Sequence, residues 1–233
     1  MFGHGQISTQ LFNAANEICG DSIFYGNWTQ IPECDGIVAV GLERIGGYYV
    51  YDLYDDCYLE NRHHLNFRTG VEMGGDYNSQ YACGYKVFHR YLNMKEVKEA
   101  IHVRRDMVWK QMPFDYDQTQ ADLRPWYREK IDEGKYRILV YSGDVDTAVP
   151  TIGADKWTSE LGYRALDGEE WRPWTTDGAM DMGGYVTVYD TKQNFTFATV
   201  RGAGHMVPLY KPRQALAMIK HFVEGRQLPY FAK

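Results

Sequence analysis

The spacing of hydrophobic positions changes along this chain, from irregular in the first part to periodic in the rest. Near the start, one helix is predicted from about Ser8 to Ile18, because its apolar residues recur on one face and Ser8 can cap the free backbone amides. From Ile18 to about Tyr85 the hydrophobic residues show no clean helical or strand period, and the one strand-like run is GYYVYDLYDD (47–56). The stretch from the end of this helix to about Tyr85 is therefore predicted to be an irregular insertion.

From Tyr91 onward, helical and strand-like patterns alternate. The helices predicted from spacing and cap residues are one capped by Asn93, those at about 123–133 and 152–161, and one that opens at Pro212. The predicted strands are Arg137–Gly143, Tyr185–Tyr189 and Phe195–Val200. Strands separated by helices imply the α/β class, with a mostly parallel sheet and helices on both of its faces.

Two of these segments also carry predictions about burial. The run RILVYSG (137–143) is continuously apolar and rich in β-branched and aromatic residues, as in a strand buried on both faces. In the last helix, Leu216, Ile219 and Phe222 form one apolar stripe, which is predicted to face the core.

The composition and net charge of the chain limit the classes of molecule that it is expected to bind. The chain has 233 residues, enough for one substantial core and a subdomain, with 44% hydrophobic and 24% charged residues. Its net charge of −6 argues against nucleic-acid or anionic-membrane partners, since those select clustered Lys and Arg. No apolar run approaches the roughly 18 residues that cross a bilayer, and MFGHGQISTQLF lacks the layout of a signal peptide. We expect a globular, soluble protein that is cytosolic or the remainder of something longer.

The four cysteines, Cys19, Cys34, Cys57 and Cys83, form no CxxC pair of the kind that binds zinc or does redox chemistry. Two disulfides are the favoured interpretation, with free buried thiols as the alternative. Two Asn-X-Ser/Thr triplets, at Asn27 and Asn194, are candidate glycosylation sites. Together these features indicate an oxidising, secretory route.

Candidate chemistry lies in two loops that follow predicted strands, SGDVDTAVP (142–150) and RGAGHMVP (201–208). In α/β sheets, functional groups gather at the carboxyl ends of strands. The first loop offers carboxylates and the second offers an imidazole. A carboxylate that accepts a hydrogen bond from one ring nitrogen fixes the tautomer, so that the other nitrogen can take a proton from a nucleophile.

The chain resembles the distal part of the serine carboxypeptidases, the α/β-hydrolase peptidase family that includes lysosomal cathepsin A. The segments that carry the resemblance, in family order, are YLNMKEVKEAIHV, RILVYSGDVDTAVPTIGADKW, WRPW, GGYVTVY and TVRGAGHMVPLYKPRQALAM. Upstream, FGHGQIS and YDLYDDC resemble the lid-bearing insertion of the family. The resemblance implies a cap or lid region at 1–90 and, at 91–233, the C-terminal part of the α/β-hydrolase core.

The resemblance also implies roles for residues of the two loops. Asp146 is expected to be the triad carboxylate and His205 the triad base, with Met206 lining the pocket for the terminal side chain of the substrate. Asp144 is the competing acid, and its alternative role is that of a turn residue that binds loop amides.

The same resemblance pairs the cysteines as Cys19 with Cys34 and Cys57 with Cys83, and it implies a secreted or lysosomal protein.

One departure from the family is serious, because the chain contains no nucleophile elbow. None of the serines stands in Gly-X-Ser-X-Gly; they are Ser8, Ser22, Ser79, Ser142 and Ser159. The Gly-Gly-Pro-Gly segment of the oxyanion site is absent too. We expect these parts to lie upstream of Met1. Losing the nucleophile costs on the order of 10⁶-fold in rate in a comparable triad, so the chain alone should be inactive.

The missing strands should leave a sheet edge unpaired, which predicts poor solubility or a partner chain.

The function expected from the resemblance is release of C-terminal amino acids from peptides through an acyl-enzyme. The alternatives are an acyltransferase with the same triad and a non-catalytic binding protein derived from the fold. The expected partners are a peptide substrate and the upstream half of the enzyme, with a second copy of the chain as a further candidate. No cofactor, metal, nucleic acid or membrane is expected.

Other polar groups receive structural interpretations. Adjacent histidines point apart on a strand, so His63-His64 is not predicted to hold a metal. Asp52, Asp55 and Asp56 lack the alternating oxygen pattern of an EF-hand and are predicted to form a solvated acidic edge. The histidines predicted to be structural are His89, His102 and His221.

Overall fold

The computed structural model describes residues 2–22, 31–45, 51–54, 90–109, 122–178 and 181–230. The chain divides into two compact units, one formed by Met1–Tyr54 with Arg124–Lys233 and the other by Asp55–Leu123. The functional division into a cap at 1–90 and a core at 91–233 remains a prediction.

The first unit opens with a short 3₁₀ helix, η1 (Phe2–His4), and two α-helices, α1 (Thr9–Cys19) and α3 (Pro32–Ile45). Helix α1 begins where the sequence predicts, because the Ser8 hydroxyl accepts a hydrogen bond from the Leu11 amide at 3.3 Å. It ends at Gly20, which adopts a positive φ of 51°.

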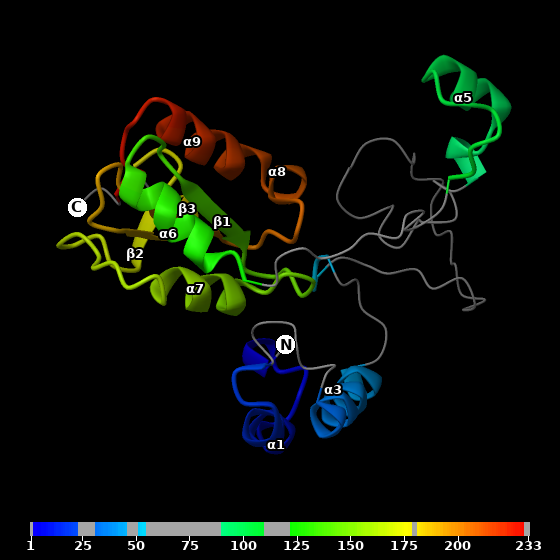
Figure 1. Cartoon of the computed structure of the whole chain (residues 1–233), viewed down its shortest axis with the longest axis horizontal. Coiled ribbons are helices and arrows are strands. Elements are labelled where there is room, and N and C mark those ends of the chain that lie inside the picture. The colour runs from blue at the N-terminus through cyan, green and yellow to red at the C-terminus, as the bar shows by residue number, and fades with distance from the viewer. Residues whose placement is uncertain are drawn as a thin grey trace. The chain divides into compact units, whose positions relative to one another are not determined.

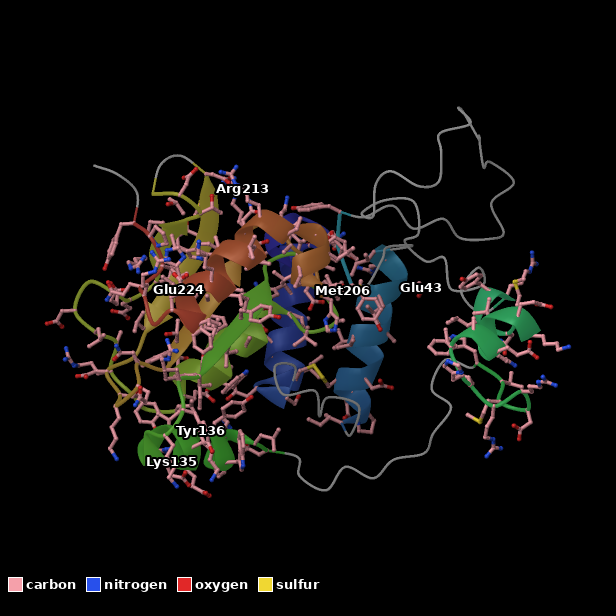
Figure 2. The ribbon with its side chains drawn as sticks, turned by 90° about the horizontal axis from the view of Figure 1, so that it is seen from above. Glu43, Lys135, Tyr136, Met206, Arg213 and Glu224 are labelled. Carbon is pink, nitrogen blue, oxygen red and sulfur yellow. A yellow bond between two sulfur atoms is a disulfide. The ribbon has the colours of Figure 1, made fainter. Side chains whose placement is uncertain are left out.

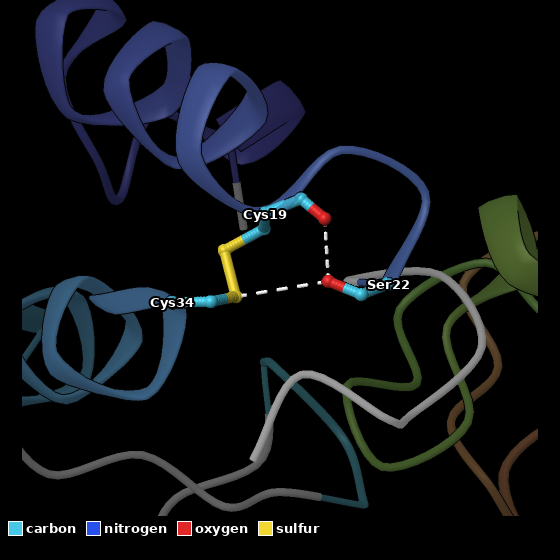
Figure 3. The surroundings of a disulfide bond; sticks show 3 residues. All are labelled: Cys19, Ser22 and Cys34. Carbon is cyan, nitrogen blue, oxygen red and sulfur yellow. Dashed lines mark hydrogen bonds between the residues drawn. A yellow bond between two sulfur atoms is a disulfide. The ribbon is translucent and has the colours of Figure 1, made fainter. Parts of the chain in front are cut away.

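A disulfide between Cys19 and Cys34 joins α1 to α3, as the resemblance implies (Figure 3). The Cα atoms of the two cysteines are 5.0 Å apart, and Ser22 contacts both, donating to the Cys19 carbonyl and lying 3.9 Å from the Cys34 sulfur. Closing a loop of this length stabilises the fold by about 3 kcal/mol on the chain-entropy model.

The rest of the unit is a sheet of four described strands with the order β1-β4-β3-β2 (Figure 1). Their bounds are β1 Leu139–Gly143, β2 Arg172–Thr175, β3 Met182–Val188 and β4 Thr196–Val200. Strands β1 and β4 are parallel, whereas β3 is antiparallel to both β4 and β2. The sheet is therefore mixed. The connection from β3 to β4 contains no helix, and a short connection can only join antiparallel neighbours.

Helices cover both faces of this sheet, as expected of an α/β protein (Figure 1). On one face, Val186, Ala198 and Val200 pack with Ala215 and Met218 of helix α9 (Pro212–Val223), which follows the short helix α8 (Val207–Tyr210).

On the other face, Phe197 packs with Ile131 of α6 (Arg124–Glu133) and Ala154 of α7 (Thr151–Ser159). These two layers hold the strands whose ends carry the candidate chemistry.

Both predictions about burial are wrong in part. In α9 the buried residues are Ala215 and Met218, while Leu216 is 70% exposed and Ile219 is also exposed. The buried residues stand one position before Leu216 and Ile219, so the buried face of the helix is rotated relative to the predicted stripe, and Phe222 is partly buried. In β1, Leu139 and Val140 pack partly buried against the clusters on the two faces, whereas Tyr141 is exposed.

The second unit contains helix α5 (Lys95–Ala100), and its predicted cap is wrong. Met94 occupies the N-cap position, with no side-chain cap hydrogen bond. Asn93 instead binds the backbone of Trp109, accepting from its amide at 2.8 Å and donating to its carbonyl at 3.2 Å. Asn93 therefore pins a loop rather than a helix end.

The strand-like run 47–56 is described only at Tyr51–Tyr54, which forms turns. Asp52 is 5% exposed, so its prediction as part of a solvated edge is wrong. The residues of the remaining minor predictions that lie outside the described ranges are Asp55, Asp56, His63, His64 and His89. No helix of the described ranges is both long and apolar enough to cross a bilayer.

Candidate active site

The two candidate loops meet because they follow adjacent parallel strands. Gly143 at the end of β1 pairs in register with Val200 at the end of β4. The chains stay in contact beyond the strands, since the Val145 amide donates to the Ala203 carbonyl at 3.1 Å. Gly143 permits this approach, because a Cβ atom there would overlap the carbonyl oxygens of Ala203 and Gly204.

Asp146 and His205, 59 positions apart, are brought into direct contact by these loops. His205 Nδ1 lies 2.8 Å from Asp146 Oδ2. The side chain of Asp146 is only 4% exposed, and its other oxygen, Oδ1, accepts hydrogen bonds from the amides of Ala148 at 2.8 Å and Val149 at 3.2 Å. Both carboxylate oxygens are thus occupied, which holds the group in one orientation toward the ring.

The imidazole of His205 keeps one nitrogen available. Its side chain is 41% exposed, and within the described ranges no protein group hydrogen-bonds its Nε2 atom. When Nδ1 carries the proton donated to Asp146, Nε2 has a lone pair directed away from the carboxylate. This arrangement can accept a proton from a group that approaches on the exposed side.

Asp144 has a different partner from Asp146. Its Oδ1 accepts a hydrogen bond from the Gly202 amide at 2.6 Å, so it fastens the two loops together. Burial raises the pKa of Asp144 above its ordinary value, while the Gly202 hydrogen bond opposes that shift. Asp146, and not Asp144, is the acid that contacts the imidazole.

Met206 follows the candidate base directly and occupies the N-cap position of α8, with its side chain partly exposed. Figure 2 shows Met206 and Glu224 at opposite ends of the α8–α9 segment. The contact of Met206 with a substrate side chain remains a prediction.

The other predicted site residues divide between described and undescribed parts of the chain. Asn194 is exposed in the turn between β3 and β4, at a φ of 52°. The predicted residues outside the described ranges are Asn27, Cys57 and Cys83.

None of the four described serines contacts the imidazole. Ser142 is the first residue of the acid loop, but it is buried and lies 3.0 Å from the Thr151 hydroxyl, which itself donates to the Gly143 carbonyl. The others bind backbone groups near them in sequence: Ser8, Ser22 and Ser159. Ser79 lies outside the described residues.

One part of this site, the segment Tyr51–Tyr54, was not predicted from the sequence. The His205 amide donates to the Tyr51 carbonyl at 2.7 Å, and the ring centroids of these two residues are 5.1 Å apart. Nothing in the hydrophobic pattern indicates this contact, because it is made by the backbone at a long separation in sequence.

Comparison with known proteins gives the context for this geometry. A family model described as serine carboxypeptidase matches residues 1–225. Serine carboxypeptidase 1 of Hordeum vulgare is 26% identical over 271 aligned residues, covering 97% of this chain and 52% of the relative. Serine carboxypeptidase-like 20 of Arabidopsis thaliana is 37% identical over 150 residues, covering 61% of this chain and 28% of the relative.

Among solved structures, Kex1(Δ)p, a prohormone-processing carboxypeptidase from Saccharomyces cerevisiae, matches with a TM-score of 0.60 and 17% identity, covering 99% of this chain and 53% of that one. The structural match shows the α/β-hydrolase fold. The chain spans about half the length of the relatives it matches throughout. With the family model matching nearly every residue, this chain belongs to the serine carboxypeptidase family.

Proposed function

We propose that Asp146 and His205 are the acid and the base of a serine carboxypeptidase active site. The observation that carries the proposal is the 2.8 Å contact between Asp146 Oδ2 and His205 Nδ1. Family membership supports it, because hydrolysis by this family is expected to need a carboxylate and an imidazole in this relation.

In the proposed mechanism, His205 Nε2 takes the proton of a serine hydroxyl while the serine oxygen attacks the carbonyl carbon of the last peptide bond of a substrate. Asp146 stabilises the imidazolium and keeps the ring in place. The imidazolium then gives its proton to the leaving nitrogen, the C–N bond breaks, and the C-terminal amino acid departs. Water, activated by the same nitrogen, attacks the acyl-enzyme, releases the shortened peptide and restores the serine hydroxyl.

The nucleophile of this mechanism comes from a segment other than the described loops. No serine of the sequence stands in a Gly-X-Ser-X-Gly elbow, and the four described ones bind other groups. We therefore propose a serine-bearing segment as the partner of this chain. The two together are called the assembled enzyme below.

The same protein is proposed to pass through an oxidising compartment and to be secreted or lysosomal. The Cys19–Cys34 disulfide supports this route, since such bonds persist in oxidising surroundings. The exposed Asn194, in its Asn-Phe-Thr triplet, is the described candidate for glycosylation.

The test is to co-express this chain with a serine-bearing amino-terminal segment of the family and to assay release of the C-terminal residue from a blocked dipeptide. His205→Ala should abolish release. The matched control is His221→Ala, which should leave activity unchanged, because the described hydrogen bond of the His221 ring is to the Ala217 carbonyl of its own helix, at 2.8 Å. Release that persists undiminished in His205→Ala would refute the role of the base.

A further inference from the structure

The segment Tyr51–Tyr54, called the bridging segment here, binds both candidate loops through its backbone. Its Tyr51 carbonyl accepts from the His205 amide at 2.7 Å, and its Leu53 amide donates to the Val145 carbonyl at 2.9 Å. Val145 directly precedes the acid of the site. One short piece of chain therefore holds the loop of the base and the loop of the acid at the same time.

The bridging segment supplies a contact to His205 that the loops do not supply to each other. Apart from the side-chain contact of Asp146 with His205, the direct bonds between the loops involve Val200, Gly202 and Ala203, which precede the base. In the described ranges, the backbone amide of His205 itself is held by Tyr51. Without the bridging segment, the backbone between Ala203 and the start of α8 would lose the hydrogen bond that holds the His205 amide.

Close packing at Gly204 shows that this contact is tightly fitted. A Cβ atom at position 204 would overlap the Tyr51 carbonyl oxygen and crowd the side chain of Asp52. Only glycine leaves room for the bridging segment to reach the next amide along.

Asp52 gives the bridging segment its shape. The residue is 5% exposed, and its Oδ1 accepts a hydrogen bond from the Tyr54 amide at 2.9 Å, the geometry of an Asx turn. A buried carboxylate that binds its own backbone restricts the turn that presents the Tyr51 carbonyl and the Leu53 amide.

We propose that the bridging segment positions the imidazole of His205 against Asp146, and that Asp52 is a positioning residue for this pair. The proposal rests on the proposed function in one respect, that His205 is the base. It adds that the geometry of the Asp146–His205 pair depends on a third segment, which is far from both loops in sequence. This segment takes no part in the proton transfer itself.

The test uses NMR on the whole chain with its disulfide intact. Two protons are followed, the ring proton on His205 Nδ1, which is shifted far downfield when a carboxylate holds it, and the backbone amide proton of His205. Asp52→Ala should weaken the downfield ring signal and raise solvent exchange of the His205 amide by roughly fivefold, the factor expected for the net loss of one hydrogen bond. Asp52→Asn keeps an oxygen acceptor and should restore both signals.

Two matched controls separate positioning from general stability. Asp167→Ala removes an aspartate that is 93% exposed, and it should change neither proton. Gly204→Ala should displace the bridging segment and abolish the downfield ring signal, whereas Gly36→Ala, where a Cβ atom meets nothing within 4 Å, should not. If Gly204→Ala fails to fold, the Asp52 series still decides.

The outcomes distinguish this inference from the proposed function. A chain whose unmodified form shows no downfield ring proton would refute the pairing of His205 with Asp146. A clear ring proton that Asp52→Ala leaves unchanged, together with an unchanged exchange rate of the His205 amide, would overturn the bridging role alone. A melting temperature lowered by Asp52→Ala without any change in either proton would likewise overturn it.

Discussion

Asp144 and Asp146 stand two residues apart in one loop, yet their carboxylates have different partners. Asp146 contacts the imidazole, and Asp144 binds the Gly202 amide. In the assembled enzyme, Asp146→Asn should lower kcat for the blocked dipeptide by about 10⁴-fold, as this change does in a comparable triad, because the amide favours the wrong ring tautomer. Asp144→Asn keeps a carbonyl acceptor for Gly202 and should cost less than about tenfold. Equal losses in the two variants would contradict the assignment.

The raised pKa of Asp144 predicts a pH dependence of stability. Burial favours its neutral form, so the folded chain holds this proton at pH values where the unfolded chain has released it. Stability from this group is therefore present at pH below the ordinary value of 3.8 and falls as pH rises through the raised pKa.

Asp144→Asn cannot lose a proton at this position, so it should avoid the loss of stability at higher pH. The free energy of unfolding of the variant minus that of the unmodified chain should therefore be larger at pH 7 than at pH 3. Urea denaturation at the two pH values measures the difference. Asp167→Asn, at an exposed position, is the control and should show no such change. A relative stability of Asp144→Asn that is the same at both pH values would contradict the prediction.

At the scale of elements, the chain after α9 is held against β2 by a buried ion pair. Arg172 and Glu169 have side chains 7% and 4% exposed and lie 2.7 Å apart. The Arg172 guanidinium also donates to the Leu228 carbonyl at 3.0 Å and lies 3.9 Å from the centroid of the Tyr230 ring, while the Tyr230 hydroxyl donates to Glu169. Removing Arg172 would leave the buried Glu169 carboxylate with the Tyr230 hydroxyl but without the opposite charge of its pair.

Arg172→Ala should accordingly lower the free energy of unfolding by about 3–5 kcal/mol, the usual cost of breaking a buried pair. The matched control is Arg164→Ala, since Arg164 is 67% exposed and pairs with Asp167 and Asp190 at the surface. Its cost should stay below about 1 kcal/mol. Urea denaturation of the two variants gives the comparison, and similar costs would show that the Arg172 pair contributes no more than a surface one.

Elements were predictable from the sequence where local chemistry determines them. The Ser8 cap sets the start of α1, and the apolar run before Gly143 marks β1. The buried face of α9 was not predictable, because its apolar residues surround more of the helix than one stripe and the fit to the sheet selects Ala215 and Met218. Periodicity identifies an element, whereas its exact rotation depends on the surface it meets.

The candidate site likewise has features that the sequence predicts and features that it does not. Two loops after neighbouring strands could be placed together from the sequence, and the contact of Asp146 with His205 agrees with that placement. The Tyr51 carbonyl could not be predicted as a partner of the His205 amide. Backbone groups are the same in every residue, so a contact between two of them leaves no pattern of side chains in the sequence.

At the scale of the whole molecule, β1 is the strand from which a partner is expected to continue the sheet. In the described sheet, β1 pairs with β4 and with no other strand, and Tyr141 is exposed on it. An unpaired strand edge presents free amide and carbonyl groups that favour pairing with a further strand. The serine-bearing segment is the proposed source of that strand.

If this is correct, adding the serine-bearing segment should slow hydrogen exchange at the β1 amides that do not bond to β4. The amides of β2, at the other edge of the described sheet, serve as the internal control and should exchange as before. Native mass spectrometry should show a one-to-one complex of the two segments. A chain that remains a monomer in the presence of that segment, with β1 exchange unchanged, would contradict the assembly and favour a non-catalytic role, because His205 would then have no serine to deprotonate.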